Sequence, residues 1–369
     1  MTIEGELVVR IATAGGRVTR AEARAERPRV AGRLFPGRPA NEAGALAGAL
    51  FSICGRSQAI AAEGAVEAAR GDAASARRRA ARDTRIAAET ITEHAWRLLI
   101  DWPKLAGGAP HVEALALGRK ALAPLLEAGE DTDLSHARDE AIAWASEVIF
   151  GRSPAAFLAI EALEDFLAWK VSAGTCVAAF AARMIPTHAA LGASDVGFLP
   201  LGHDGWISRI LAPAIDADAA FDDVPHWNGG ARETGALARV ASHPLVKASI
   251  EQWGRGVGAR LVARLVELAA ALEAFGGRHG AIPLDAGNAI SWVDTARGLL
   301  VHRVALEGDR IAAYRIVAPT EWNFHPDGAF TRGAMALAAD DTARTEREVH
   351  WLVASLDPCV GVRYEASHA

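Results

Sequence analysis

Residues 294–323 read DTARGLLVHRVALEGDRIAAYRIVAPTEWN, and their pattern indicates β-structure in a chain that is otherwise mainly helical. Two short runs, Leu299–Leu306 and Arg310–Val317, lie on either side of a turn at Glu307-Gly308-Asp309. Successive residues of a strand point to opposite faces, and a glycine-containing turn joins the strands of a hairpin. The stretch therefore predicts a β-hairpin near the C-terminal end.

The start of the chain predicts a second hairpin at residues 6–25. Two short runs there, Glu6–Thr13 and Arg17–Ala25, lie on either side of Gly15-Gly16. Between the hairpins, residues 41–276 form a helical body, because apolar residues recur at spacings of three and four. Helices are expected at Asn41–Phe51, Gln58–Arg70, Ala73–Leu99, Val112–Glu127, Ser135–Phe150, Pro154–Val171 and Pro244–Phe275, and near Thr331–Ala339 and Thr342–Ser355.

The length of the chain fits one large domain, residues 1–369, or about two domains, and the pattern favours the mainly α class with small β-hairpins. Its C-terminal part, residues 294–369, carries the second hairpin and the last helices. The chain is 51% hydrophobic, which excludes disorder, and its net charge of −6 argues against a nucleic-acid partner. No basic segment followed by an apolar run, and no uncharged apolar run of membrane-spanning length, is visible. A cytoplasmic protein without membrane insertion is expected.

Common catalytic motifs are missing from the sequence. No HExxH, Walker A, GxSxG or strand-linked GxGxxG pattern occurs, so a zinc hydrolase, a nucleotide enzyme and a serine hydrolase lack support. The basic run Arg77–Arg82 is interpreted as a solvated helix face rather than a binding patch. The segment Asp222–His226 is interpreted as a polar loop rather than a set of metal ligands.

Cysteine is the informative residue type, although three cysteines in 369 residues cannot form a disulfide framework. Cys176 lies in an alanine-rich helical stretch, where a buried apolar role is the ordinary one. Cys54, in FSICGRS, and Cys359, in SLDPCVGV, lie instead beside glycine and proline. Those neighbours indicate constrained turns, so the two thiols are candidate ligands or nucleophiles.

These cysteine motifs, with four further segments in the same order, resemble the large subunit of nickel–iron hydrogenases. That family carries RICGVC near its start and DPCxxC near its end, and the four thiolates hold the Ni–Fe site. The resemblance covers the chain from end to end with a shortened middle, and it implies a degenerate form of the large-subunit fold. The further segments are Ile3–Leu7 (IEGHL in the family), Gly235–Arg239 (GPLAR), Asp294–His302 (APRGALxH) and Tyr314–Asn323 (YQxVVPTTWN).

Departures from the family pattern argue against hydrogen turnover. Ser57 and Val362 stand where the second cysteine of each pair belongs, and Ala61 and Glu365 replace the histidines that follow the pairs. Gly32 is the nearest match to the magnesium-ligand glutamate. By the resemblance, the retained thiolates are those that bind nickel terminally. Two thiolates cannot reproduce a four-sulfur bimetallic site, so nickel is not expected and the chain is predicted not to be an enzyme. Magnesium is not expected because Gly32 has no carboxylate to bind it.

The pocket that surrounds the iron's diatomic ligands is retained. In the enzymes an arginine and a serine or threonine donate hydrogen bonds to the two cyanides, and Arg297 and Thr320 match these positions. A guanidinium stays charged and makes strong charge-assisted bonds, and a hydroxyl supplies a second donor. A structural ion pair is the plainer alternative for Arg297. Glu4 matches a proton-relay glutamate and is a possible remnant of that relay.

The combination of two cysteines and a retained cyanide pocket resembles hydrogenase accessory proteins of the HupK/HoxV type. It implies a scaffold that holds an Fe(CN)2(CO) group on Cys54 and Cys359, with nickel and magnesium absent. The implied partners are a small HypC-type maturation chaperone and the hydrogenase large-subunit precursor. Two alternatives remain open. One is an inactive structural or regulatory subunit that pairs with an iron–sulfur small subunit, and the other is an enzyme with Cys54 as nucleophile.

Overall fold

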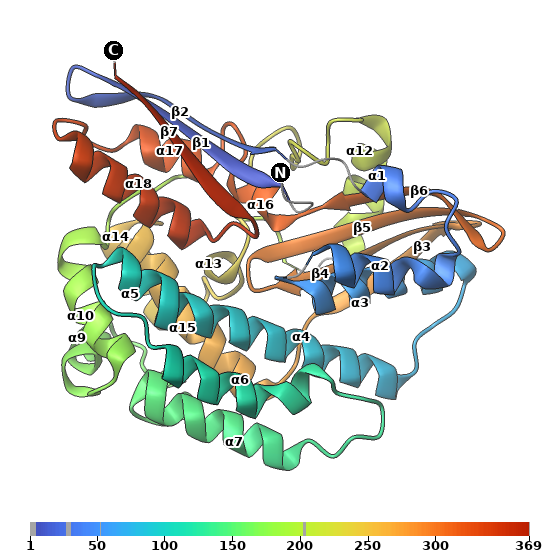
Figure 1. The fold of residues 1–369 in the computed structure, drawn as a ribbon, viewed down its shortest axis with the longest axis horizontal. Coiled ribbons are helices and arrows are strands. Elements are labelled where there is room, and N and C mark those ends of the chain that lie inside the picture. The colour runs from blue at the N-terminus through green and yellow to red at the C-terminus, as the bar shows by residue number, and fades with distance from the viewer. Residues whose placement is uncertain (1–4, 27–30, 52, 202–203, 369) are drawn as a thin grey trace.

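The computed structural model describes residues 5–26, 31–51, 53–201 and 204–368, and helices dominate it (Figure 1). The mainly α class is confirmed. The helices are α1 Ala31–Leu34, α2 Ala43–Leu50, α3 Gly55–Arg70, α4 Ala76–Trp96, α5 Trp102–Leu105, α6 Val112–Leu126, α7 Ser135–Ala145, α8 Pro154–Leu158, α9 Leu163–Ser172, α10 Cys176–His188, α11 Asp204–Trp206, α12 Ala212–Ala217, α13 Ala236–Arg239, α14 Pro244–Trp253, α15 Val257–Ala274, α16 Pro319–Asn323, α17 Ala329–Met335 and α18 Thr342–Leu356. Three π-helical turns, Arg97–Asp101, Ser146–Phe150 and Ile207–Leu211, extend or precede helices.

The N-terminal hairpin is part of a three-stranded sheet. Strands β1 (Glu6–Ala14) and β2 (Arg17–Glu26) pair antiparallel as expected, and β7 (Gly361–His368) pairs parallel to β1 on its other side. Alternate residues of β1 face one apolar cluster with α18, since Leu7 and Val9 pack there with Leu352. The sheet therefore joins the two ends of the described chain above α17 and α18 (Figure 1).

The C-terminal hairpin is half of a four-stranded antiparallel sheet. Its strands are β3 (His279–Asp285), β4 (Asn288–Thr295), β5 (Gly298–Glu307) and β6 (Arg310–Val317), paired in chain order. One face packs on α3, and the other packs on the segment around α12. With both faces covered, β4 is buried along almost its whole length.

A helical layer built around α15 contains the largest apolar cluster. α15 packs against α4, α8, α14 and α18, and it is buried almost all round. Three of its buried side chains are charged: Arg260, Arg264 and Glu267. Charges are rarely fully buried unless they are paired, so these residues point to a polar network inside the molecule.

Several helix expectations were wrong in their extent. Residues 154–171 form two helices, because the chain leaves the helix after Leu158 and buries Phe157 and Ile160 in the core. Residues 244–275 also form two helices. At the break between them, a Cβ on Gly256 would lie 2.8 Å from the carbonyl oxygen of Ala189, so the chain crosses too closely for a side chain.

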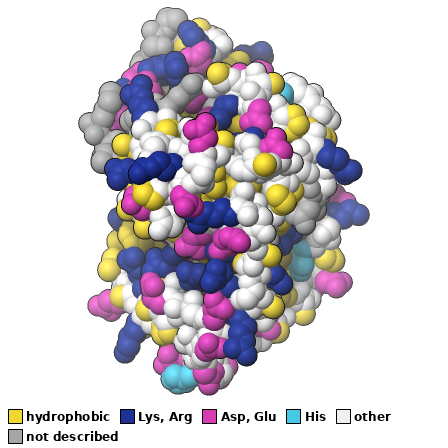
Figure 2. Space-filling model, turned by 90° about the vertical axis from the view of Figure 1, so that its right-hand side faces the viewer, with side chains coloured by type: hydrophobic (Ala, Val, Ile, Leu, Met, Phe, Trp, Pro, Cys, Tyr) yellow, Lys and Arg dark blue, Asp and Glu magenta, His cyan; other side chains and the backbone are white. Residues whose placement is uncertain are grey.

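The basic run on α4 is only partly solvated, as a second correction. Arg77 and Arg78 lie on the surface, but Arg82 is buried and forms ion pairs with Glu63 and Glu67 of α3. Elsewhere on the surface, acidic and basic side chains lie among one another on the face shown in Figure 2. No helix in the described ranges combines the length and the apolar character needed to cross a membrane.

Candidate functional site

Cys54 lies in a tight turn between α2 and α3. It is the last residue before α3, and its carbonyl accepts the first helical hydrogen bond, from the backbone N–H of Gln58. A Cβ on Gly55 would lie 2.8 Å from the carbonyl oxygen of Gly48, so the close approach of the two helices requires glycine after the cysteine. The turn holds the Cys54 thiol in a buried position.

Burial dominates the electrostatics of Cys54. It raises the pKa of the thiol far above its usual value, and the charges of Cys359 and Glu89 raise it further. The charge of Arg297 and a hydrogen bond from Gln58 act in the opposite direction. Cys54, Cys359 and Arg297, which are widely separated in the sequence, are therefore close enough to interact electrostatically.

Cys359 lies in the loop that joins α18 to β7. α18 ends at Asp357, which adopts a left-handed conformation with φ of 57°, and Pro358 follows it. The backbone N–H of Cys359 donates to Thr320 Oγ1 at 3.2 Å, and its Sγ lies 3.1 Å from the same oxygen. Thr320 is buried at the start of α16. The structure thus brings Thr320 directly against the cysteine, in addition to any role toward a bound ligand.

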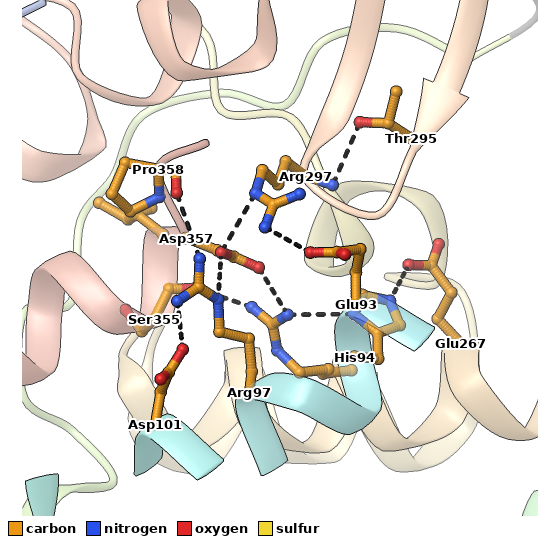
Figure 3. A network of polar contacts seen from close by, with 12 residues as sticks. Glu93, His94, Arg97, Asp101, Glu267, Thr295, Arg297, Ser355, Asp357 and Pro358 are labelled. Atoms are coloured by element: carbon orange, nitrogen blue, oxygen red, sulfur yellow. Dashed lines mark hydrogen bonds and ion pairs between the residues drawn. The ribbon is translucent and has the colours of Figure 1, made fainter. Parts of the chain in front are cut away.

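Asp357, the residue two positions before Cys359, lies among three guanidinium groups (Figure 3). Its Oδ1 lies 2.6 Å from Arg97 Nε and 3.3 Å from Arg297 Nε, and its Oδ2 accepts from Arg264 Nη1 at 2.9 Å. Burial alone would raise the pKa of Asp357, but the charges of Arg297, Arg97 and Arg264 hold it well below its usual range. The carboxylate therefore stays ionised and fixes the loop that carries Cys359.

Further contacts extend this network across α4 and α15. Arg97 also donates to the carbonyl oxygen of Pro358 at 3.2 Å, which ties α4 to the cysteine loop. His94 lies between Glu267 Oε2, at 2.8 Å from its Nε2, and Arg264 Nη1, at 3.0 Å from its Nδ1. A guanidinium only donates, so Nδ1 accepts and Nε2 carries the proton. Burial lowers the pKa of His94, which agrees with this neutral form.

Arg297 is ion-paired and also faces the cysteines. It follows β4 in the tight turn before β5, and its Nη2 donates to Glu93 Oε2 at 2.7 Å (Figure 3). Arg297 therefore forms an ion pair, and its role toward a ligand stays a prediction. Within the described part of the chain, the pairs of Arg297 use Nε and Nη2, and a guanidinium carries five N–H donors. The Nη1 group is thus available to another acceptor.

Ser57 and Val362, which stand where the hydrogenases have their other two cysteines, make different contacts. Ser57 is buried, and its hydroxyl donates to Glu89, whose carboxylate also accepts from the backbone N–H groups of Arg56 and Ser57 at 2.9 and 3.0 Å. Glu89 of α4 thereby caps the start of α3. Val362 lies on β7 and packs against the apolar cluster beneath β1.

The remaining departures lie in ordinary structural surroundings. Ala61 is buried on α3 under the four-stranded sheet, Glu365 forms ion pairs with Arg10 and Arg363 on the three-stranded sheet, and Gly32 lies on α1. Glu4 lies outside the described residues. Over the residues that the structure describes, no group of three or more His, Cys, Asp or Glu is arranged to hold a metal ion.

Sequence reasoning missed most of the residues around the two cysteines. The Asp357 signal was visible in the DPC motif, which places a carboxylate beside the cysteine. No local signal marked Glu93 and Arg97, or Gln58 and His302, because their partners come from distant segments. They are ordinary polar residues of helices and strands until the fold brings them together.

A groove on the surface reaches the site at Thr320. Its volume is about 1330 Å³, and it lies between β2 and the segment of α16 and α17. Its lining includes Thr320, Glu321 and Phe324, and Thr331 and Met335 of α17. The groove is therefore an opening next to the residue that contacts Cys359.

Comparison with known proteins identifies the family to which the chain is similar. The sequence profile of the nickel-dependent hydrogenase family matches residues 234–362. The hydrogenase expression/formation protein HoxV of Cupriavidus necator is 35% identical over 91% of this chain and 90% of its own length. The hydrogenase expression/formation protein HupK of Rhizobium leguminosarum bv. viciae is 32% identical over 94% of this chain and 92% of its own length.

Solved structures show the same fold at much lower identity. The Ni-Fe-Se hydrogenase of Desulfovibrio vulgaris Hildenborough is 16% identical, with a TM-score of 0.63 over 94% of both chains. An NAD+-reducing [NiFe]-hydrogenase is also 16% identical, with a TM-score of 0.58 over 93% of both chains. The fold is that of the nickel–iron hydrogenase large subunit, and the chain belongs to the family of hydrogenase expression/formation proteins that includes HoxV and HupK.

Proposed function

We propose that this protein acts in hydrogenase maturation as a scaffold that holds an Fe(CN)2(CO) group on Cys54 and Cys359 before the group passes to the hydrogenase large-subunit precursor. One observation carries the proposal. Cys54, Cys359, Arg297 and Thr320 come from four separate segments and converge on one place. Thr320 touches Cys359 at 3.1 Å, and the charge of Arg297 acts on both sulfurs.

The donor set suits an iron that brings its own ligands. Two thiolates are too few for a resident nickel–iron centre, but three diatomic ligands already occupy much of an iron's coordination sphere. The two thiolates make the bound assembly anionic, and the buried Arg297 guanidinium offsets that charge. Ser57 and Val362 have no thiol to add, so fewer metal–sulfur bonds must break at handover.

The network around Asp357 supports a site that is preformed. A ligand held by packed, hydrogen-bonded neighbours keeps its geometry before the metal arrives, which lowers the cost of binding. The groove is lined by Thr320, which contacts Cys359, and it is where we expect the delivering and the receiving protein to dock. A HypC-type chaperone is the expected donor of the iron group, and the large-subunit precursor is the expected acceptor.

Infrared spectroscopy tests the proposal. The protein is coexpressed with the hydrogenase maturation machinery and isolated under anaerobic conditions. We expect absorption bands of bound CO and cyanide in the wild type, and their loss in Cys54→Ser and Cys359→Ser. Cys176→Ser is the matched control and keeps the bands, because Cys176 lies away from the site at the start of α10.

The contrary result is also defined. Absence of the bands in the wild type, with both cysteine variants still supporting hydrogenase maturation, overturns the scaffold. Stable copurification with an iron–sulfur protein, without dependence on Cys54, would then favour the structural-subunit alternative.

A further inference from the structure

Three buried polar side chains form a chain of hydrogen bonds behind Cys54, and the proposed function uses none of them. Gln58 Nε2 lies 3.7 Å from Cys54 Sγ, and Gln58 Oε1 lies 2.9 Å from His302 Nε2. His302 Nδ1 lies 2.7 Å from the hydroxyl of Tyr314. All three side chains are at most 2% exposed. Polar groups this deep are normally kept for a structural or functional reason.

The fold explains how the three side chains meet. Gln58 is one helical turn after Cys54, so both lie on the same side of the first turn of α3. On the sheet, His302 of β5 pairs with Ile316, and Val304 pairs with Tyr314 of β6. His302 and Tyr314 are therefore diagonal neighbours on one face of the sheet. That face is covered by α3, which brings Gln58 onto His302.

The direction of these hydrogen bonds follows from Tyr314, the member of the row that lies farthest from Cys54. Burial lowers the pKa of His302 to about 3, so the ring is neutral and has one donor and one acceptor nitrogen. In the described part of the molecule, the hydrogen-bond partner of the Tyr314 hydroxyl is His302. If His302 Nδ1 donated to Tyr314, the tyrosine hydrogen would be buried without an acceptor, which is unfavourable.

Tyr314 therefore donates to Nδ1, His302 Nε2 donates to Gln58 Oε1, and the amide nitrogen of Gln58 faces the sulfur. In this order every bond points toward Cys54. Cys54 Sγ, the last atom in this row of hydrogen bonds, is therefore required to accept one. A thiolate that is bound to a metal accepts hydrogen bonds well. A thiol that donated to Gln58 would need the amide in the opposite orientation.

We propose that Gln58 is a positioning residue that donates an N–H···S hydrogen bond to Cys54 when that thiolate binds a metal, and that His302 and Tyr314 lock its amide in this orientation. The inference rests on the proposed function only in taking Cys54 as a metal ligand. Contacts of this kind orient a ligand atom and adjust how strongly it donates to the metal.

Cadmium ion alone serves as the probe, because Cd²⁺ prefers thiolates and its sulfur-to-metal absorption band reports on the ligand sulfur. Binding to the full chain is measured anaerobically, by the affinity and by the position of this band. We expect Gln58→Met to bind Cd²⁺ about tenfold more weakly and to shift the band, since loss of such a contact typically costs 10–100-fold in metal affinity. His302→Leu follows in the same direction with a smaller effect, and Tyr314→Phe shows the smallest.

Two further variants make the test specific. Gln252→Met, on the exposed face of α14, is the matched control and leaves both readouts unchanged. Gln58→Glu keeps the size of the side chain and an oxygen for His302 but offers the sulfur no N–H donor when it is ionised. It is expected to bind Cd²⁺ at least as weakly as Gln58→Met, and it decides the question if Gln58→Met fails to fold.

Wild-type affinity and an unchanged band in Gln58→Met or Gln58→Glu would overturn the inference. Failure of the wild type to bind Cd²⁺ through Cys54, shown by an unaffected Cys54→Ser variant, overturns it as well. The proposed function fails separately. A protein without CO and cyanide bands whose Cd²⁺ affinity still depends on Gln58 refutes the iron scaffold and retains the role of Gln58.

Discussion

The loop that carries Cys359 is surrounded by charged side chains, whereas a chain of neutral side chains, with the Glu89 carboxylate nearby, lies behind Cys54. Asp357 and its three arginine partners fix the first from α4, α15 and the β4–β5 turn. Gln58, His302 and Tyr314 support the second from α3 and two strands. The two sulfurs of one candidate site thus depend on different forces.

The difference matters for the proposed function, in which the site would bind an iron group and later release it. Buried ion pairs are costly to break because each partner left behind is an uncompensated charge, so the Cys359 side is expected to keep its geometry. Neutral hydrogen bonds cost less to rearrange, and an amide can rotate about its last side-chain bond. The Cys54 side is therefore expected to adjust when a metal arrives or leaves.

The largest effect on the free energy of unfolding is expected from the charged residues around Asp357. Asp357→Ala leaves Arg97, Arg264 and Arg297 without their shared carboxylate and should lower the free energy of unfolding by about 3–5 kcal/mol. Urea denaturation followed by circular dichroism measures it. Arg332→Ala is the control, because its pair with Asp195 is largely exposed and exposed pairs contribute about 0–1 kcal/mol. Equal losses of stability in the two variants would show that the buried charges around Asp357 do not hold the Cys359 loop more firmly than an exposed ion pair would.

An intermediate effect on the free energy of unfolding is expected when the pH is lowered, through His302 behind Cys54. Burial lowers the pKa of His302 to about 3, whereas an unfolded histidine titrates near pH 6.5, so the unfolded chain takes up the proton first. The contribution of His302 is therefore complete above pH 6.5 and is lost as the pH falls toward 3, by about 1 kcal/mol per pH unit. Asp357 behaves differently, because its pKa is lowered below the ordinary range of an aspartate. Its contribution to stability is therefore lost only in more acidic conditions than that of His302.

Urea midpoints between pH 7 and pH 5 measure this dependence. His302→Gln should make the slope shallower, whereas His136→Gln, on the exposed face of α7, should leave it as in the wild type. A slope that does not respond to His302→Gln would show that other groups carry the acid sensitivity.

The smallest effect on the free energy of unfolding is expected from Thr320, which contacts Cys359. Thr320→Val removes the hydroxyl that contacts Cys359 N and Sγ, and it leaves a buried N–H unpaired. A loss of about 1–3 kcal/mol in the free energy of unfolding is expected, toward the lower end because the loop is partly exposed. Thr320→Ser keeps the hydroxyl and should restore wild-type stability, and a serine variant as unstable as the valine variant would contradict this reading.

Elements with a local signal were predictable from the sequence, and elements defined by distant partners were not. The hairpin β5–β6 has alternating residues and a glycine turn, and it was predicted nearly to the residue. Strand β4 was missed because both of its faces are buried, which removes the alternation. Strand β7 was not predicted, since only its parallel pairing with β1 makes it a strand.

The same distinction applies to the site. Cys54, Cys359, Arg297 and Thr320 were identified through the resemblance to a family, and the structure brings them together. Glu93 and Arg97 belong to an amphipathic helix whose pattern shows only that some positions are buried. Nothing in that pattern says that the partly buried Arg97 meets Asp357, which lies 260 positions further along the sequence.

The parallel pairing of β1 with β7 also sets the order of events during synthesis. Cys359 directly precedes the strand that docks beside β1, so its loop is in place only after nearly the whole described chain has left the ribosome. Pairings between distant segments form late, because a long loop must close first. The nascent protein would therefore present Cys54 without Cys359 for most of the synthesis of the described chain, and the two cysteines of the proposed site would come together only after β7 has been made.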